Sequence, residues 1–315
     1  MESPQAIKSR LKSVKNVGQI TKAMEVVAAT KMRKAQETAL GTRPYAFEAL
    51  RLLRRLTQNA EVKVPLLEKR EVKKTLVVII ASDRGLAGSF NSQVTRLADQ
   101  FFACDEYKMR EGHSYQLAVM GKKAVGYGAK KPYPTVKIFT DFGEITEPRE
   151  IKLLTDYIVA GFVAGNWDRV VTASTHFRTA LKQEPLIRQI LPLDAAKIKE
   201  LVEAIVPASG RYAELDHDLP SPNRQSAENK IDYIFEPSLD AVLETLVPHL
   251  VEMQIYHLFL EAKASEHSSR RVAMKTASDN AGELADELTL EFNKARQVGI
   301  TREIIEITTT LATLE

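Results

Sequence analysis

The chain has 315 residues and a mass of 35.2 kDa, and its 44% hydrophobic and 27% charged residues are ordinary for a soluble protein with a sizeable core. Its net charge of +3 is too small to indicate nucleic acid as a partner, and its single cysteine, Cys104, excludes an intramolecular disulfide and a zinc cluster. The longest clean apolar run, residues 76–81, is far shorter than the roughly 20 residues of a membrane span. A helical pattern that begins at Ser3 predicts no signal or transit peptide in front of it.

The first predicted element is a long helix over residues 1–57. Ser3 is suited to cap it and Pro4 to begin it, because a serine hydroxyl accepts from free backbone N–H groups and proline lacks one. Apolar residues then recur at steps of three and four, which places them on one helical face. The residues of this predicted stripe are Ile7, Leu11, Val14, Val17, Ile20, Met24 and Val27.

Residues 70–236 change character and predict a compact domain. The run 75–81, TLVVIIA, is β-branched and bounded by turn residues, as buried parallel strands are. Strands and helices are expected to alternate after it, which is typical of a doubly wound, Rossmann-like α/β domain. The further strands are expected at 116–120, 136–140, 169–174, 185–193 and 231–235, and the helices at 92–104 and 150–164. An exposed insertion is expected near 195–229, with a loop at 210–229 rich in Pro, Ser, Asn and Asp.

The helical pattern returns over residues 238–315. At 1.5 Å per residue this helix would extend roughly 110 Å and the first helix roughly 80 Å, whereas a globule of the whole chain would measure only about 50 Å. Long helices with apolar stripes need a partner to cover them, and each of these two can cover the other. The first enters the middle domain at its C-terminal end and the last leaves it from its N-terminal end. The sequence therefore predicts an antiparallel coiled coil attached to a central α/β domain.

The charges of the two predicted helices favour this pairing. Residues 1–57 hold 12 Lys and Arg against 4 acidic residues, and residues 238–315 hold 7 against 13, so that the helices carry about +8 and −6. Opposite charges favour contact between the two helices of one chain and oppose the pairing of like helices from two chains. A self-associating coiled-coil scaffold, one alternative interpretation, is disfavoured for this reason.

Three further patterns could carry chemistry. The loop 82–91, SDRGLAGSFN, follows a strand and precedes a helix, where phosphate-binding loops lie, but it has neither GxGxxG spacing nor a Gly-Lys-Ser/Thr ending. The six histidines show no HExxH motif and no metal-ligand spacing with cysteine. Ser174 and His176 form an isolated Ser-x-His without a nucleophile elbow. A structural role is favoured for each, and a nucleotide-dependent α/β enzyme with a helical arm remains the alternative.

Basic residues cluster on the first helix. We consider three interpretations of this cluster, which are a solvated face, a nucleic-acid patch and a site for an acidic protein partner. Nucleic acid is disfavoured because the cluster contains no aromatic residue and the neighbouring helix is acidic. The clustered residues are Lys8, Arg10, Lys12, Lys15, Lys22, Lys31, Arg33 and Lys34.

Four segments resemble the ATP synthase gamma subunit family, in the family's order. They are IKSRLKSVKNVGQITKAMEVVAATKMRKAQ at 7–36, SDRGLAGSFN at 82–91, SEHSSRRVAMKTASDNA at 265–281 and FNKARQVGITREIIEI at 292–307. The resemblance implies the central rotor shaft of an F-type ATP synthase, which couples proton-driven rotation of the c ring to ATP synthesis or hydrolysis. It also implies a non-catalytic subunit without a cofactor or metal of its own.

The same resemblance implies partners and contact residues. The coiled coil would stand inside a ring of three alpha and three beta subunits, and the middle domain would meet the epsilon subunit and the ring of c subunits. The complex would lie at the cytoplasmic face of the bacterial plasma membrane, with this chain peripheral. Met24 could instead simply pack on the other helix. The candidate partner contacts are Lys22, Met24, Lys31, Arg33, Arg270, Gln297 and Thr301.

The chain departs from the family's pattern at three places. Its C-terminus, EITTTLATLE, replaces a small-residue ending, and Ala87 and Ser89 replace a cysteine and a glycine of the central segment. The stretch from Ala195 to Asn229 is longer than in typical members of the family. A chain with one cysteine cannot form the paired-thiol insert of chloroplast relatives, so redox control of that type is excluded.

Overall fold

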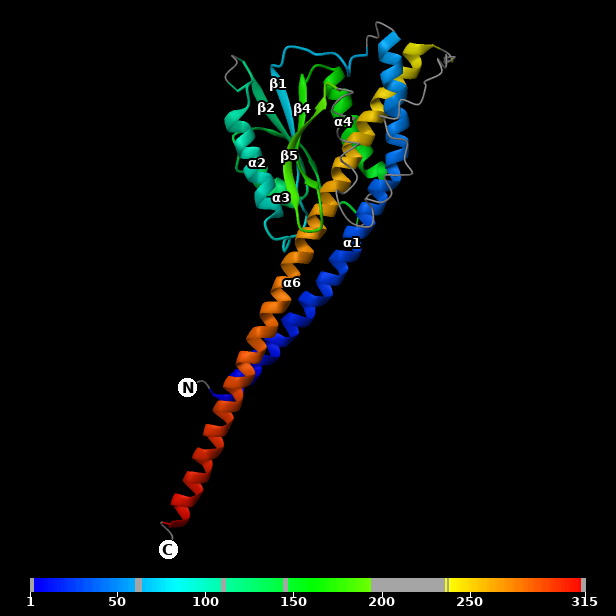
Figure 1. Cartoon of the computed structure of the whole chain (residues 1–315). Coiled ribbons are helices and arrows are strands. Elements are labelled where there is room, and N and C mark those ends of the chain that lie inside the picture. The colour runs from blue at the N-terminus through cyan, green and yellow to red at the C-terminus, as the bar shows by residue number, and fades with distance from the viewer. Residues whose placement is uncertain are drawn as a thin grey trace. The chain divides into compact units, whose positions relative to one another are not determined.

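The chain divides into two units that differ in architecture. The first unit comprises Met1–Ala29 and Arg270–Glu315, and the second comprises Thr30–Ser269. Two long helices contribute to both units, α1 (Pro4–Asn59) and α6 (Leu239–Ala312), which confirms both predicted helices (Figure 1). The structure, a computed structural model, describes residues 3–59, 64–108, 112–143, 147–193, 236 and 238–312.

The second unit is built on a five-stranded sheet in the order β3-β2-β1-β4-β5. The first four strands are parallel, and β5 is antiparallel to β4 at the edge. The strands are β1 (Lys74–Ile80), β2 (Ser114–Met120), β3 (Thr135–Phe139), β4 (Arg169–Phe177) and β5 (Gln183–Leu191). Each overlaps a predicted strand, because the β-branched runs that signal a buried strand are also the ones that fill this sheet.

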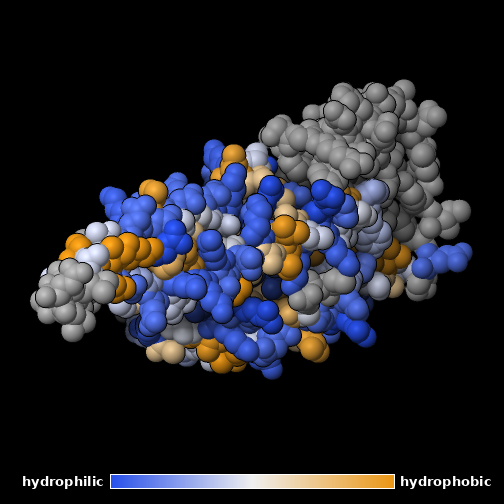
Figure 2. Space-filling model, turned by 90° about the horizontal axis from the view of Figure 1, so that it is seen from below, coloured by the Kyte–Doolittle hydropathy of each residue, from blue (hydrophilic) through white to orange (hydrophobic). Residues whose placement is uncertain are grey.

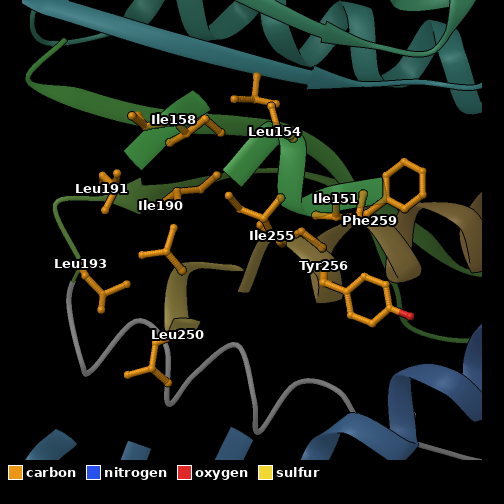
Figure 3. Close-up of a cluster of buried hydrophobic side chains, with 14 of the residues drawn as sticks. Ile151, Leu154, Ile158, Ile190, Leu191, Leu193, Leu250, Ile255, Tyr256 and Phe259 are labelled. Carbon is orange, nitrogen blue, oxygen red and sulfur yellow. The ribbon is translucent and has the colours of Figure 1, made fainter. Parts of the chain in front are cut away.

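Helices cover both faces of the sheet. Alternate residues of β1 divide between the two faces, with Val77 and Ile79 on one and Leu76 and Val78 on the other. The first face packs against α2 (Phe90–Cys104) and α3 (Lys122–Gly128). The second packs against α4 (Pro148–Val163) and the beginning of α6, where Figure 3 shows Ile151, Leu154 and Ile158 of α4 facing Ile190, Ile255 and Phe259. Burial on both faces explains why β1 is continuously apolar from Leu76 to Ile80 rather than alternating.

Two local features fix α4 in this layer. Its start is marked by Pro148 at the first turn and by Glu150, whose Oε2 accepts from the Glu147 backbone N–H at 3.0 Å. Further along, a Cβ on Gly161 would lie 2.0 Å from the ring of Trp167. The indole therefore packs directly on the helix backbone, and its Nε1 donates to the Ile158 carbonyl at 3.2 Å.

Part of the predicted domain differs or lies outside the described residues. The seven-residue helix α3 was not predicted, because KKAVGYG is too short and too rich in glycine to show a helical period. The predicted strand at 231–235, the loop at 210–229 and the insertion near 195–229 lie outside the described residues. Within the described part of the chain, no helix combines the length and the apolarity that a membrane crossing requires.

Candidate functional site on the paired helices

The first unit is an antiparallel pair formed by the beginning of α1 and the end of α6. The Cβ position of Gly18 lies 3.4 Å from the Cβ of Ala281, and Ser278 Oγ donates to the Gly18 carbonyl at 3.4 Å. Further along α1, the charge of Arg271 lowers the pKa of Glu25, which places these two residues near each other. Residue numbers therefore rise along α1 where they fall along α6, and the two helices are antiparallel. The predicted antiparallel coiled coil is therefore confirmed in this unit.

The face of α1 that meets α6 differs from the predicted stripe. Ile7, Leu11, Val14 and Met24 are buried or half-buried as expected, but small residues take several other inward positions beyond Val14. Val17, Ile20 and Val27 were predicted to be inside, and this was wrong, since they are 52%, 59% and 51% exposed. Small side chains let the two backbones approach closely, so they occupy the contact although they are less hydrophobic. The small or short residues at the contact are Gly18, Thr21 and Ala28 of α1 with Ala281 and Ala285 of α6.

Charged side chains border this contact. Lys22 Nζ lies 2.9 Å from Glu25 Oε2, and the hydrogen bond raises the pKa of Lys22 and lowers the pKa of Glu25. The carboxylate of Asp279 adds to the raised pKa of Lys22, while the cations Arg271 and Lys275 add to the lowered pKa of Glu25. Exposed pairs of this kind contribute little to stability, but they favour one register of the helices.

Large apolar side chains are left exposed on the outside of this unit. On α1 they are Val17, Ile20, Val26 and Val27, each more than half exposed. Figure 1 shows α6 continuing past the beginning of α1. Figure 2 shows hydrophobic residues gathered at the left, beside the smaller of the two grey regions. The exposed apolar residues of this last part of α6 are Leu290, Val298, Ile300, Ile304, Ile305 and Ile307. Apolar groups repeated along a helix in this way mark a surface for protein contact.

The predicted contact residues do not form one cluster. Gln297 and Thr301 are exposed neighbours on α6, with Thr301 Oγ1 donating to the Gln297 carbonyl at 2.9 Å. Lys22 is exposed beside Asp279, from which α6 rises about 27 Å to Gln297. In the described part of the first unit, these candidate residues are therefore distributed along the helix pair instead of lying together.

The remaining candidates vary in exposure. Met24 is half-buried at the helix contact, and Arg270 is only 9% exposed. Lys31 and Arg33 belong to the second unit, where Lys31 is half-buried and Arg33 is exposed.

The loop 82–91 uses its polar groups internally. Asn91 Nδ2 donates to Ser82 Oγ at 2.8 Å, and Ser82 Oγ donates to the Arg84 carbonyl at 2.7 Å. The Ala87 carbonyl accepts from Ser269 Oγ of α6 at 2.9 Å. These contacts favour a structural role for the loop over phosphate binding.

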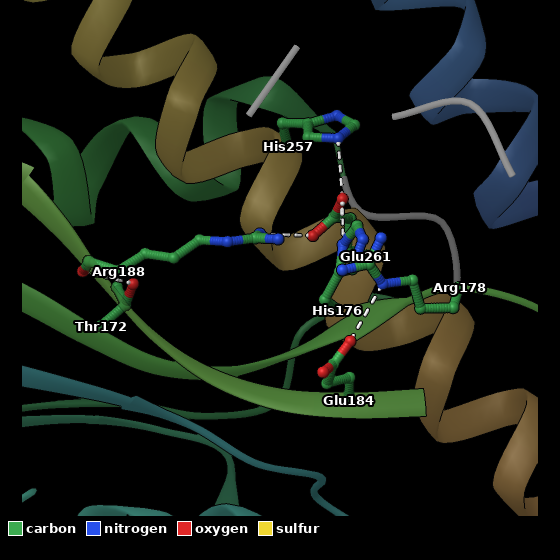
Figure 4. A network of polar contacts seen from close by, with 7 residues as sticks. All are labelled: Thr172, His176, Arg178, Glu184, Arg188, His257 and Glu261. Carbon is green, nitrogen blue, oxygen red and sulfur yellow. Dashed lines mark hydrogen bonds and ion pairs between the residues drawn. The ribbon is translucent and has the colours of Figure 1, made fainter. Parts of the chain in front are cut away.

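Two of the histidines lie in a buried polar cluster that the sequence did not indicate. His176 and His257 both contact the carboxylate of Glu261, which is buried between α6 and the sheet (Figure 4). Their numbers are far apart, and only the packing of α6 on β4 brings them together. No group of His, Cys, Asp and Glu suited to a metal ion occurs among the described residues.

An antiparallel pair of long helices with outward apolar side chains places the chain among proteins that have a helical stalk. Comparison with known proteins identifies which one. A family model described as ATP synthase matches residues 3–314. The ATP synthase gamma chain of Roseiflexus castenholzii (strain DSM 13941 / HLO8) is 38% identical over 317 residues, covering 100% of this chain and 99% of that one. The gamma chain of Opitutus terrae is 38% identical over 308 residues, covering 98% and 97%.

A solved structure agrees in fold. A chain of the Euglena gracilis mitochondrial ATP synthase, OSCP/F1/c-ring, matches with a TM-score of 0.62 and 20% identity, over 99% of this chain and 94% of that one. The chain therefore belongs to the ATP synthase gamma chain family. Its role is that of the central rotor shaft of an F-type ATP synthase.

Proposed function

We propose that the helix pair of residues 1–57 and 238–315 turns inside a ring of three alpha and three beta subunits, and that this chain is not catalytic itself. A rotor couples to catalytic sites only if its contacts with them differ from one angle to the next. The pair described above is asymmetric, since α6 runs on alone past α1 (Figure 1). The two helices also expose different side chains. ATP would then be made or hydrolysed at the beta subunits, whose nucleotide affinity changes with the angle of the shaft.

The proposed contacts with the catalytic subunits are of two kinds. The basic residues Lys22, Lys31 and Arg33 suit acidic loops of the beta subunits, and Lys22 and Arg33 are exposed. Gln297 and Thr301 are exposed on the part of α6 that extends beyond α1, where they can meet the surrounding ring. Met24 and Arg270 are less accessible, and we propose that they contact partners through their outer edges.

The central α/β domain, residues 70–236, would meet the epsilon subunit and the c ring. In this proposal proton flow through the membrane turns the c ring, which turns this domain and the shaft. The chain would thus be peripheral, at the cytoplasmic face of a bacterial plasma membrane, and would touch the membrane only through its partners.

The observation that carries the proposal is the set of large apolar side chains left exposed on the helix pair. Val17, Ile20, Val26 and Val27 would be costly to leave in water along a free helix, at about 25 cal/mol for each Å² of apolar surface. A surrounding ring of subunits would cover them. The internal contacts of the loop 82–91 favour this interpretation over a nucleotide-binding enzyme.

Reconstitution tests the proposal. The purified chain alone is expected to hydrolyse no ATP, whereas its mixture with bacterial alpha and beta subunits is expected to form an active ATPase that sediments as one complex. Replacing Val17 and Ile20 by serine should weaken assembly without unfolding the chain, because both side chains are exposed. ATP hydrolysis by the isolated chain, or an alpha–beta ATPase that forms equally well without it, would contradict the proposal.

A further inference from the structure

One face of α6 carries buried polar side chains where the helix meets β4 and β5. They recur at steps of three and four residues, which places them in a single row along the helix. Each is at most 5% exposed, which is rare for polar side chains outside functional or paired positions. This polar row consists of Gln254, His257, Glu261, Ser265 and Ser268.

Glu261 lies at the centre of the polar row and has three basic neighbours. Arg188 of β5 donates from Nη1 to Glu261 Oε2 at 2.6 Å, and His176 of β4 donates from Nδ1 to Oε1 at 2.9 Å. His257, one turn earlier on α6, places Nε2 3.3 Å from Oε1. Figure 4 shows the three side chains converging on the carboxylate from the sheet and from the helix.

The carboxylate is held in its charged form despite burial. Burial alone favours the neutral acid, but the Arg188 guanidinium and the His176 hydrogen bond hold the pKa of Glu261 well below its usual value. Short charge-assisted hydrogen bonds are stronger and more directional than neutral ones. The ion pair therefore depends on one particular placement of α6.

The two sheet donors reach Glu261 from separate points. Arg188 pairs across the strands with Thr172, which lies four residues before His176 on β4. Four residues of strand rise about 13 Å, and an even spacing keeps both side chains on the same face of the sheet. Rotating α6 about its axis, or sliding it by one turn, would therefore break at least one of the two bonds.

The ends of the polar row are held as well. Ser268 Oγ donates to the Ala180 carbonyl at 2.5 Å and accepts from Gln183 Nε2 at 3.2 Å. Gln254 Nε2 donates to the Gln189 carbonyl at 3.4 Å. From Gln254 to Ser268 the helix rises about 21 Å, so the hairpin of β4 and β5 holds α6 at three levels.

The rest of this interface is apolar and less selective. α6 contributes aliphatic and aromatic side chains such as Val247, Val251 and Phe259 to the core that it shares with α4. Cores of this kind can repack when volume is conserved, and they lose a unique arrangement before they lose stability. Directional polar contacts restrict the helix to one angle in a way that apolar packing does not.

We propose that Glu261, with the polar row around it, sets the angle of α6 on β4 and β5, so that torque on the α/β domain turns α6 without slippage. This inference rests on the rotor function proposed above and adds a positioning residue to it. Glu261 acts through Arg188 and His176.

The test separates angular locking from simple stability. The double variant Glu261→Leu with Arg188→Met replaces the ion pair by apolar groups, which buried sites commonly tolerate. In the full chain assembled with its partner subunits, we expect a melting temperature near that of the wild type. We also expect a loss of torsional stiffness, measured from the angular fluctuation of a probe on the α/β domain, and a loss of protons pumped for each ATP hydrolysed. The matched control, Glu184→Leu with Arg178→Met, removes an exposed ion pair of the same hairpin and should leave both quantities unchanged.

Each outcome decides between the interpretations. A stable double variant with wild-type stiffness and coupling would overturn the role of Glu261. If the double variant does not fold, Glu261→Gln, which keeps the shape and removes the charge, gives the same measurement, and unchanged stiffness there would overturn the role equally. A wild-type chain that assembles without rotating would contradict the rotor function itself.

Discussion

The helix α6 is held in two different ways in the two units. In the first unit, its Ala281 lies against Gly18 of α1, and small residues such as Thr21, Ala28 and Ala285 are buried along the pair. In the second unit, the polar row meets β4 and β5 through charged and neutral hydrogen bonds.

The difference shows what each contact can specify. A seam of small residues brings backbones close and gains dispersion energy, while it leaves the larger apolar residues such as Val17 and Ile20 free to face other subunits. A buried ion pair adds less net stability but accepts only one angle. α6 thus takes part in a helix pair with an outward contact surface in one unit and is held at a fixed angle on the sheet in the other.

The largest expected effect comes from unpairing the buried charge. Arg188→Met leaves the Glu261 carboxylate without its strongest partner, and we expect a loss of about 3–5 kcal/mol in the free energy of unfolding. Urea unfolding of the full chain, followed by circular dichroism, measures it. Arg178→Met on the same hairpin should change stability by less than about 0.5 kcal/mol. If both variants lost the same free energy of unfolding, the buried Arg188–Glu261 pair would contribute no more to stability than the exposed Arg178–Glu184 pair.

A smaller effect is expected at the small-residue seam. Gly18→Leu would force a bulky side chain where the glycine Cβ position is already 3.4 Å from Ala281, and overpacking should cost about 1–3 kcal/mol. Gly18→Ala should be tolerated, because 3.4 Å is close to ordinary contact and alanine favours helix by about 1 kcal/mol over glycine. Helix content during thermal unfolding measures both. A stable Gly18→Leu chain would argue that the helices are not closely paired.

The pH dependence of stability should identify the Glu261 pair. Because the folded-state pKa of Glu261 is lowered, its contribution is fully present above the unfolded pKa of about 4.5 and is lost as the pH falls through the folded value. The stability difference between wild type and Glu261→Gln should therefore be greatest above about pH 4.5 and shrink in acid. The charged and titratable groups that face the Glu261 carboxylate are Arg188, His176 and His257, and they are the same residues in the wild type and in the Glu261→Gln variant.

Glu184→Gln is the control for this pH series, since Glu184 is exposed and also has a lowered pKa, which its hydrogen bond from Arg178 explains. Its stability difference should be small throughout. A wild-type advantage over Glu261→Gln that grows as the pH falls below 4 would contradict the assigned direction of the pKa.

The smallest effect on stability is expected at the outward apolar residues. Replacing Val17 and Ile20 by serine should change the free energy of unfolding by less than about 0.5 kcal/mol for each residue, because both are exposed. The ATPase activity of the assembled complex should nevertheless fall. The exposed neighbour Gln19, changed to serine, serves as the control. Full activity of the Val17 and Ile20 variant would remove these residues from the proposed contact surface.

Some of the site could be predicted from single positions, and some could not. The stripe of α1 was placed correctly at Ile7, Leu11, Val14 and Met24 and wrongly at Val17, Ile20 and Val27. Hydrophobicity alone predicts Val17, Ile20 and Val27 as the inward residues. Close packing of two helices instead places their smaller neighbours inside, which are Gly18, Thr21 and Ala28. The Glu261 cluster combines residues from β4, β5 and α6, and no local pattern links them.

The sequence by itself determined the two long helices, the strands of the α/β domain and the opposite charges of the chain's ends, because periodicity, β-branching and charge are local properties. The tertiary structure alone decided which face of α1 meets α6 and how Glu261 is buried with its partners. Both depend on how closely two surfaces approach, and that distance is set by packing over the whole interface.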